Sequence, residues 1–259
     1  MGLDPSAPAS EPVQARPPDP APSVGDGGGT GPDPGNEGIP KEHAQGAATF
    51  MGRRFRCDPR ALIPRGETEL LARTAVKLAR SLGSGSLTLL DVGTGSGNLA
   101  VTLALELPDS LIHASDISRE ALELAALNVG DHALDRRVFL HHGSLFEPFA
   151  DLDLMGQVDG VVSNPPYIPT RALEGMAPEI RDHEPREAFD GGAFGLTVVR
   201  GLIGGVEDVL RPGGFLAFEV GAGQGPLMGR LLESRSYLTG IRTHTDEAGT
   251  VRVLSALRT

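Results

Sequence analysis

The sequence predicts an α/β domain built on a parallel sheet with helices on both faces. Two observations lead to this fold class: short apolar segments alternate with segments of helical periodicity, and short loops join them. A third is the glycine-rich turn Gly93–Gly97, which lies between an expected strand and an expected helix. In sheets of this kind, ligands bind beyond the carboxyl ends of the strands, near the switch point of the strand order.

The first 50 residues differ in composition from the rest of the chain. They hold 10 of the 21 prolines and 9 of the 35 glycines, with few large apolar side chains. Such a segment cannot bury enough apolar surface to offset the entropy lost when it becomes ordered. We therefore expect residues 1–48 to form a disordered Pro/Gly-rich tail and residues 49–259 to form one folded domain.

Four helices are expected from apolar periodicity and from signals at their ends. The segment Glu67–Leu82 begins with acids, carries basic residues later and is followed by glycines, which suits the helix dipole and the C-cap. Asn98–Leu107 stops at a proline, and Ser118 caps a helix that runs to about Val129. Thr197–Leu210 has the helical period, although its glycines weaken helix propensity.

Strands are expected where short apolar runs are bounded by turn residues. Five strands are expected first along the chain: Leu87–Val92, Leu111–Ser115, Arg137–Leu140, Val158–Ser163 and Phe215–Val220. The fifth follows a turn at Arg211–Gly214. Two further strands, Ile241–Thr245 and Val251–Leu257, are joined by DEAG and are predicted to form a terminal hairpin.

Charge and composition exclude several classes of protein. Of 34 acidic and 23 basic residues, seven acids and two bases lie in the first 50, which leaves 27 against 21, a net charge of −6. Without a basic stripe, nucleic acid is not a preferred partner. The lone Cys57 excludes a disulfide framework and a multi-cysteine zinc site, and we expect no metal. Because the chain lacks a membrane-length apolar run and a secretory signal, we expect a cytoplasmic enzyme without a membrane partner.

The glycine-rich turn indicates a nucleoside cofactor. Glycines let the backbone approach a ligand closely. Asp116 ends the next expected strand, 19 residues after Gly97, where a carboxylate can accept hydrogen bonds from both ribose hydroxyls. The G-x-G-x-G spacing differs from the G-x-G-x-x-G of dinucleotide folds, which favours S-adenosylmethionine over NAD. The alternative is a tight turn that binds nothing.

The tetrapeptide Asn164-Pro165-Pro166-Tyr167 follows a buried strand and indicates the acceptor chemistry. Two prolines stiffen the loop and remove two N–H donors, so the loop presents carbonyl acceptors. Asn164 adds a side-chain acceptor, and Tyr167 adds an aromatic face. Acceptors beside a flat surface suit a planar –NH2 group, either a carboxamide or an exocyclic base amine. The alternative is a rigid proline turn with a buried tyrosine.

Together DVGTGSG (91–97), ASD (114–116) and SNPPY (163–167) resemble class I S-adenosylmethionine-dependent methyltransferases that act on planar amino nitrogens. More narrowly, the chain resembles the glutamine-N5 methyltransferases of peptide-chain release factors (the HemK/PrmC type), because three further segments match. These are LIPRGETELL (62–71), HEPREAFDGG (183–192) and RPGGFLAFEVG (211–221). The resemblance covers residues 50 to 258. It implies a Rossmann-like, seven-stranded, mostly parallel sheet with a C-terminal antiparallel hairpin.

The resemblance also implies roles for single residues. Asp116 would hold the ribose of S-adenosylmethionine, and Leu145 would line the adenine pocket. Asn164 and the carbonyl of Pro165 would accept the two amide N–H bonds, with Tyr167 packed on the amide plane. The implied cofactor-binding residues are Asp91, Gly93, Thr94, Gly95, Gly97, Asp116, Leu145 and Asn164. The implied substrate-binding residues are Asn164, Pro165, Pro166 and Tyr167, and all of these except Pro166 are also implied to be catalytic.

Two departures from the family keep other functions open. The tail stands where the family has a helical N-terminal domain that helps engage the release factor, and Gly66 replaces the usual proline after PR. The acceptor is therefore a release factor or, alternatively, a small-molecule or natural-product amide. A nucleic-acid amino-methyltransferase shares NPPY but is disfavoured by the negative charge and by the lack of a target-recognition region. A non-catalytic adaptor of the same fold is the third alternative.

Overall fold

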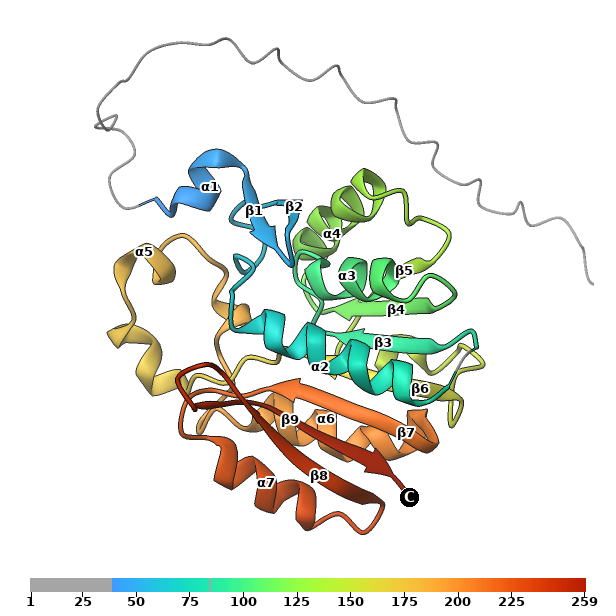
Figure 1. Cartoon of the computed structure of the whole chain (residues 1–259). Coiled ribbons are helices and arrows are strands. Elements are labelled where there is room, and N and C mark those ends of the chain that lie inside the picture. Colours follow the sequence, from blue (N-terminus) through green and yellow to red (C-terminus); the bar gives the residue numbers. More distant parts are fainter. Residues whose placement is uncertain (1–38, 84) are drawn as a thin grey trace, which may run out of the picture. The chain divides into compact units, whose positions relative to one another are not determined.

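The computed structural model describes residues 39–83 and 85–259, and a seven-stranded sheet forms their centre (Figure 1). The strand order is β5-β4-β3-β6-β7-β9-β8. The first five strands in this order are parallel, and β9 runs antiparallel to both β7 and β8. The strands are β3 (Thr88–Val92), β4 (Leu111–Asp116), β5 (Val138–His142), β6 (Val158–Ser163), β7 (Leu210–Glu219), β8 (Leu238–Thr245) and β9 (Val251–Arg258). This arrangement confirms the predicted fold class and the terminal hairpin.

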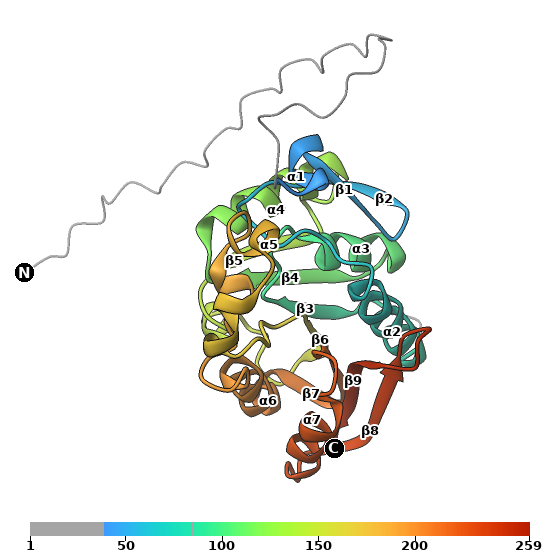
Figure 2. The same ribbon diagram turned by 90° about the vertical axis from the view of Figure 1, so that its left-hand side faces the viewer.

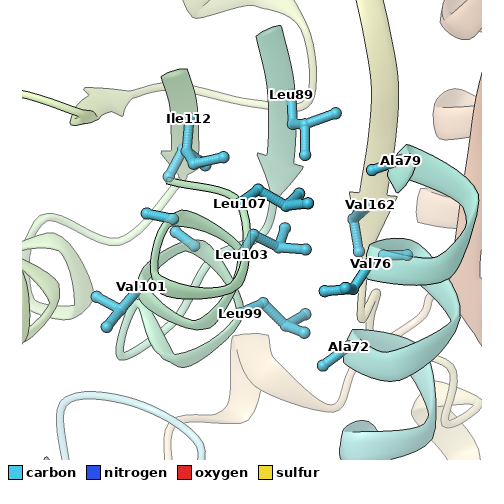
Figure 3. Close-up of a cluster of buried hydrophobic side chains, with 14 of the residues drawn as sticks. Ala72, Val76, Ala79, Leu89, Leu99, Val101, Leu103, Leu107, Ile112 and Val162 are labelled. Atoms are coloured by element: carbon cyan, nitrogen blue, oxygen red, sulfur yellow. The ribbon is translucent and has the colours of Figure 1, made fainter. Parts of the chain in front are cut away.

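Helices cover both faces of the sheet (Figures 1 and 2). One face carries α2 (Thr68–Ser81), α3 (Asn98–Glu106) and α4 (Arg119–Asp131), and the other carries α6 (Thr197–Val209) and α7 (Gly225–Glu233). Figure 3 shows Val76 of α2 and Leu103 of α3 packed with Val162 of the sheet. Among the described helices, none has the length and apolar character needed to cross a bilayer.

The inner strand β3 shows why the segments that form the parallel strands are apolar. Its residues Leu89 and Leu90 are both fully buried, but they belong to the hydrophobic clusters of opposite faces. A strand with helices on both sides buries every side chain, so it forms a continuous apolar run rather than an alternating one. The strand β6 is likewise buried at all its positions.

The parallel strands end together at one edge of the sheet, and this edge holds the residues predicted to bind the cofactor and the substrate. The strand β3 is followed in the chain by β4 on one side, whereas its other neighbour is β6, so the order switches between β3 and β6. Ligands bind at such switch points. The glycine-rich turn leaves β3 there, and Asn164-Pro165-Pro166-Tyr167 leaves β6 beside it.

The predicted tail ends earlier than residue 48. A short helix α1 (Lys41–Gln45) and a hairpin of β1 (Ala47–Phe50) and β2 (Arg53–Arg56) precede the main sheet. Two aromatic side chains of the hairpin, Phe50 and Phe55, are fully buried in the same cluster as α2 and α3. The described folded part therefore includes residues 39–48 in addition to the domain predicted from residue 49. The tail predicted for residues 1–38 lies outside the described residues.

Smaller differences concern the connections. The predicted turn Arg211–Gly214 lies inside β7, as an irregularity where the register with β6 shifts. The helix α7 was not predicted, although its leucines recur at helical spacing and a proline stands at its start. Four short helical segments of the loops were also not predicted: η1 (Glu147–Phe149), η2 (Thr170–Gly175), α5 (Pro178–Arg181) and η3 (Arg186–Ala188).

Replacing Phe55 by alanine tests whether the hairpin belongs to the main core. Because the side chain is fully buried, Phe55→Ala is expected to lower the free energy of unfolding by about 3–5 kcal/mol. Urea denaturation followed by circular dichroism measures this. The neighbouring exposed Arg54 gives a matched control, and Arg54→Ala is expected to change stability by no more than about 0.5 kcal/mol. Equal effects of the two substitutions would show that the hairpin does not contribute to the core.

Candidate active site

A cavity of about 490 Å³ lies at the carboxyl edge of the sheet. The turns after β3, β4 and β6 line it, together with the segment that precedes α2. A smaller cavity of about 60 Å³ adjoins it. Asn164 and Pro165 line both, so the two cavities meet at the start of the NPPY segment.

Backbone forms the wall of the large cavity at the glycine-rich turn. Gly93 and Gly95 line the cavity and Gly97 does not, and all three have positive φ, of 75°, 55° and 79°. Gly97 is also the N-cap of α3, and a Cβ at this position would lie only 3.1 Å from the Cβ of Ala125 in α4. Glycine is therefore required by both conformation and close packing, and the turn presents peptide groups without side chains to a ligand.

Asp91 lies beneath this turn and does not line the cavity. Its Oδ2 accepts hydrogen bonds from Thr94 Oγ1 at 2.6 Å and from the Ala100 N–H, in the first turn of α3, at 3.0 Å. Burial raises the pKa of Asp91 to about 7. Side chains alternate along β3, so Asp91 points toward α3 and not toward the cavity. In this structure Asp91 supports the turn from behind, and Thr94 lines the cavity; the cofactor-binding role that the resemblance implies for Asp91 stays a prediction.

Asp116 ends β4 and lines the cavity beside the turn. Its two oxygens accept hydrogen bonds from the N–H groups of Gly95, at 2.8 Å, and Ser118, at 2.9 Å. These bonds fix the carboxylate, while each oxygen keeps a further lone pair for a ribose hydroxyl. Burial raises the pKa of Asp116, and the backbone N–H groups oppose that rise.

Apolar side chains line the cavity beyond Asp116. Ile117 is 62% exposed at its wall, and Leu145 lies across from it after β5. The Leu145 side chain packs toward α6, where a Cβ on Gly201 would lie 2.5 Å from its Cδ1. A carboxylate for the ribose, apolar walls for a purine and a bare backbone turn are together suited to hold S-adenosylmethionine.

The NPPY segment presents two acceptors where the cavities meet. Ser163, at the end of β6, donates through its Oγ to the carbonyl of Val92 at 2.7 Å and so ties the two turns together. Asn164 donates from Nδ2 to Thr68 Oγ1 at 3.2 Å. Within the described residues, neither Asn164 Oδ1 nor the Pro165 carbonyl has a hydrogen-bond partner. Both remain available to a substrate.

Tyr167 lines the small cavity and not the large one, whereas Pro166 lines the large one. The Tyr167 carbonyl accepts a hydrogen bond from Gln224 Nε2 at 3.0 Å. Its ring lies against Gly221, where a Cβ would be 2.9 Å from the ring Cδ2. Burial raises the pKa of the phenol, so the ring stays neutral. An uncharged aromatic face therefore forms one wall of the small cavity.

Three side chains at the site, those of Thr68, Arg65 and Glu184, were not singled out from the sequence. Thr68 is 2% exposed and donates through Oγ1 to Glu219 Oε2 at 2.7 Å. Burial raises the pKa of Glu219 to about 7. Arg65 lines both cavities and pairs with the buried carboxylate of Glu184. Their segments, PRGET, HEPRE and FEVG, were recognised by resemblance, but spacing along the chain does not reveal contacts 119 to 151 residues apart.

A glycine-rich loop braces the NPPY segment from behind. A Cβ on Gly191 would lie 2.7 Å from the Pro166 carbonyl oxygen, and one on Gly195 would overlap the Tyr167 carbonyl oxygen. Gly191 also donates its N–H to the carbonyl of Ile168 at 2.9 Å. The backbone of this loop therefore fixes the position of the substrate-binding segment.

Comparison with known proteins defines the class. The family model "Methyltransferase small domain" matches residues 68–199, from α2 to the start of α6. Ribosomal protein L11 methylase from Lactobacillus delbrueckii subsp. bulgaricus has a similar structure, with TM-score 0.52, 24% identity, and coverage of 79% of this chain and 85% of that one. Precorrin-6y C5,15-methyltransferase from Geobacter metallireducens gives TM-score 0.51 at 14% identity, covering 79% and 94%. Fold and family model together place the chain among class I S-adenosylmethionine-dependent methyltransferases.

Curated relatives narrow the class further. A release factor glutamine methyltransferase of Gloeobacter violaceus is 40% identical over 218 residues, which are 84% of this chain and 74% of that protein. Its counterpart in Bacillus cereus is 40% identical over 199 residues, 76% of this chain and 69% of that one. The chain belongs to the release factor glutamine methyltransferase family, as the sequence motifs indicate.

Replacing Asp116 by asparagine tests the ribose contact. Asp116→Asn keeps the size of the side chain but removes its charge and one acceptor, so we expect S-adenosylmethionine to bind roughly 10- to 100-fold more weakly. Isothermal titration calorimetry measures this. Asp109→Asn, on an exposed turn remote from the cavity, is the control and is expected to bind normally. Unchanged affinity of Asp116→Asn would remove Asp116 from the cofactor site.

Gly195→Ala tests the bracing loop. The substitution adds a methyl group that overlaps the Tyr167 carbonyl, so we expect the methyl-transfer rate to fall roughly 10- to 100-fold while cofactor affinity is retained. Gly52 has a similar φ, 72° against 69°, with open space around its Cβ position. Gly52→Ala therefore carries the same backbone strain without the clash, and its rate is expected to stay near that of the wild type. Equal rates for the two variants would contradict the bracing role.

Proposed function

We propose that the protein transfers the methyl group of S-adenosylmethionine to the side-chain amide nitrogen, N5, of a glutamine in a cytoplasmic peptide-chain release factor. The observation that carries this proposal is the pair of acceptors where the large and small cavities meet, Asn164 Oδ1 and the Pro165 carbonyl, which have no hydrogen-bond partner among the described residues. Family membership supports the same substrate. Asn164, Pro165, Pro166 and Tyr167 would bind the amide, and the large cavity would hold the cofactor.

The size of the small cavity favours an amide over a nucleic-acid base. A volume of about 60 Å³ holds only a few groups of water size, since a single water needs roughly 10–15 Å³ of such space. A carboxamide has three heavy atoms and fits, whereas an adenine has ten. The acidic balance of the chain, with 34 acids against 23 basic residues, also disfavours a polyanionic substrate.

The two acceptors would help to overcome the low nucleophilicity of the amide nitrogen. An amide nitrogen is a poor nucleophile because its lone pair is delocalised into the carbonyl. Hydrogen bonds from its two N–H groups to Asn164 Oδ1 and the Pro165 carbonyl would hold the nitrogen with its lone pair directed at the large cavity. S-adenosylmethionine, when bound, supplies an electrophilic methyl group. Positioning of this kind can contribute up to ~7–11 kcal/mol to lowering the barrier.

The methylated nitrogen then returns to a neutral amide by losing one proton. The new N–C bond forms as the methyl–sulfur bond breaks, and the positively charged nitrogen becomes a strong acid. It releases a proton to water without a dedicated base. The acceptors at Asn164 and Pro165 therefore act by orientation and by stabilising positive charge on the N–H groups.

Asn164→Ala tests the proposed function. We expect the variant to keep its fold and bind S-adenosylmethionine, but to methylate a release factor at least ~100-fold more slowly, because one oriented acceptor is lost. The assay transfers a labelled methyl group to purified release factor and locates it by peptide mass spectrometry at the glutamine of the Gly-Gly-Gln loop. Gln157→Ala removes an exposed amide far from the cavities and serves as the control.

The outcomes separate the reaction from its substrate. Undiminished transfer by Asn164→Ala would contradict the assigned role of the NPPY segment. Absence of a methyl mark with the wild-type protein, while the cofactor still binds, would contradict the release-factor substrate and favour a small-molecule or natural-product amide.

A further inference from the structure

We infer that Thr68 and Glu219 fix the orientation of the Asn164 side-chain amide, so that its oxygen and not its nitrogen faces the methyl acceptor. This inference rests on the proposed function, because it concerns how the acceptor for the substrate N–H is presented. The two residues are positioning residues, since they act through Asn164 and not on the reacting atoms.

The three side chains come from three different elements. Thr68 is the first residue of α2, Glu219 is the last of β7, and Asn164 follows β6. A continuous chain of hydrogen bonds joins them: Thr68 Oγ1 donates to Glu219 Oε2 at 2.7 Å, and Asn164 Nδ2 donates to Thr68 Oγ1 at 3.2 Å. Thr68 is 2% exposed and Glu219 is 3% exposed, so the bond between them is shielded from water, whereas the bond from Asn164 is part-buried at the cavity.

The number of hydrogens that each group carries fixes the direction of these hydrogen bonds. A hydroxyl has one hydrogen, and an ionised carboxylate can only accept. Thr68 must therefore donate its one hydrogen to Glu219, and its oxygen can only accept a hydrogen bond from Asn164. The amide nitrogen of Asn164 is thereby directed at Thr68 and its oxygen at the cavity. Without this constraint the amide could turn over, because its oxygen and nitrogen have nearly the same shape. The turned amide would set N–H against the N–H of the substrate.

Ionisation of Glu219 therefore controls the arrangement. Glu67, just before α2, acts on the pKa of Glu219 as a like charge and raises it, whereas Arg252 of β9, which is paired to Asp246, lowers it. Tyr167 stays neutral beside it, and Arg65 lines the same small cavity.

Burial and Glu67 raise the pKa of Glu219 to about 7, against the lowering by Thr68 and Arg252. Below that pH the protonated carboxyl can donate to Thr68. The hydroxyl is then free to donate to the Asn164 oxygen, and the turned amide becomes available.

Substitution of Thr68 tests the inference. Thr68→Val keeps the shape but removes the hydroxyl, whereas Thr68→Ser keeps the hydroxyl and removes a methyl group. At saturating cofactor and release factor, we expect kcat of Thr68→Val to fall roughly 10- to 100-fold and Thr68→Ser to recover most of it. Calorimetry of S-adenosylmethionine binding and thermal unfolding are measured on the same samples. Equal losses of kcat in Thr68→Val and Thr68→Ser would overturn the inference, because they would indicate that only the packing of Thr68 matters.

The pH profile of Glu219→Gln gives an independent readout. In the wild type, kcat is expected to rise with pH as Glu219 ionises near pH 7. In Glu219→Gln, which cannot ionise, the part of that rise that comes from Glu219 should disappear. Any inflection from Asp91, whose pKa is also about 7, would remain and would be the same in both proteins. An unchanged profile would overturn the inference.

Failure of the inference differs from failure of the proposed function. If Asn164→Ala loses methyl transfer but Thr68→Val does not, the inference fails and the proposed function stands. If Asn164→Ala keeps its activity, the proposed function fails.

Discussion

The parallel pairing of β3 with β6 is the constraint on which the rest of the site depends. It sets the ends of two buried strands side by side, so that the glycine-rich turn and the NPPY segment form neighbouring walls. The Ser163 hydroxyl, bonded to the Val92 carbonyl, locks the two ends at this level. A shift of either strand by one residue would turn its side chains to the opposite face, so the packing of both faces defines the register.

Buried or half-buried carboxylates are the second common element of this edge. Asp91, Asp116 and Glu219 each stand near the end of a parallel strand, and burial raises the pKa of each. Leaving a carboxylate in such a place is costly unless donors surround it. The donors here belong to the segments that line the site. Thr94 and Gly95 of the glycine-rich turn donate to Asp91 and Asp116, and Thr68 of α2 donates to Glu219. Each carboxylate thus holds local backbone or side chains in place through the hydrogen bonds it accepts, and among the described residues Asp91 Oδ1 has no such partner.

The sequence reveals the parts of the fold whose signals are local. Continuous apolar runs identify the buried strands, and the glycine-rich turn and NPPY identify the two walls of the site. The hairpin at Phe50 and Phe55 escapes detection because each strand is only four residues long. The hydrogen bonds among Thr68, Asn164 and Glu219 escape for a different reason: they join residues brought together only by the completed sheet. Asp91 is a different case: its motif indicates the cofactor, and in the structure its carboxylate accepts hydrogen bonds from Thr94 and Ala100 behind the turn, which no local pattern shows.

The arrangement of donors and acceptors accounts for selection of an amide over a carboxylate of the same shape. Pro165 and Pro166 have no N–H to offer, so where the cavities meet the NPPY segment presents only acceptors, Asn164 Oδ1 and the Pro165 carbonyl. The one cation that lines the small cavity, among the described residues, is Arg65, and Glu184 pairs with it. A glutamate side chain would lose its hydration there and meet like-signed dipoles beside Glu219. A glutamine amide would satisfy both acceptors with its two N–H bonds. A site that leaves buried polar groups unpaired with the wrong ligand discriminates more strongly than one that measures size alone.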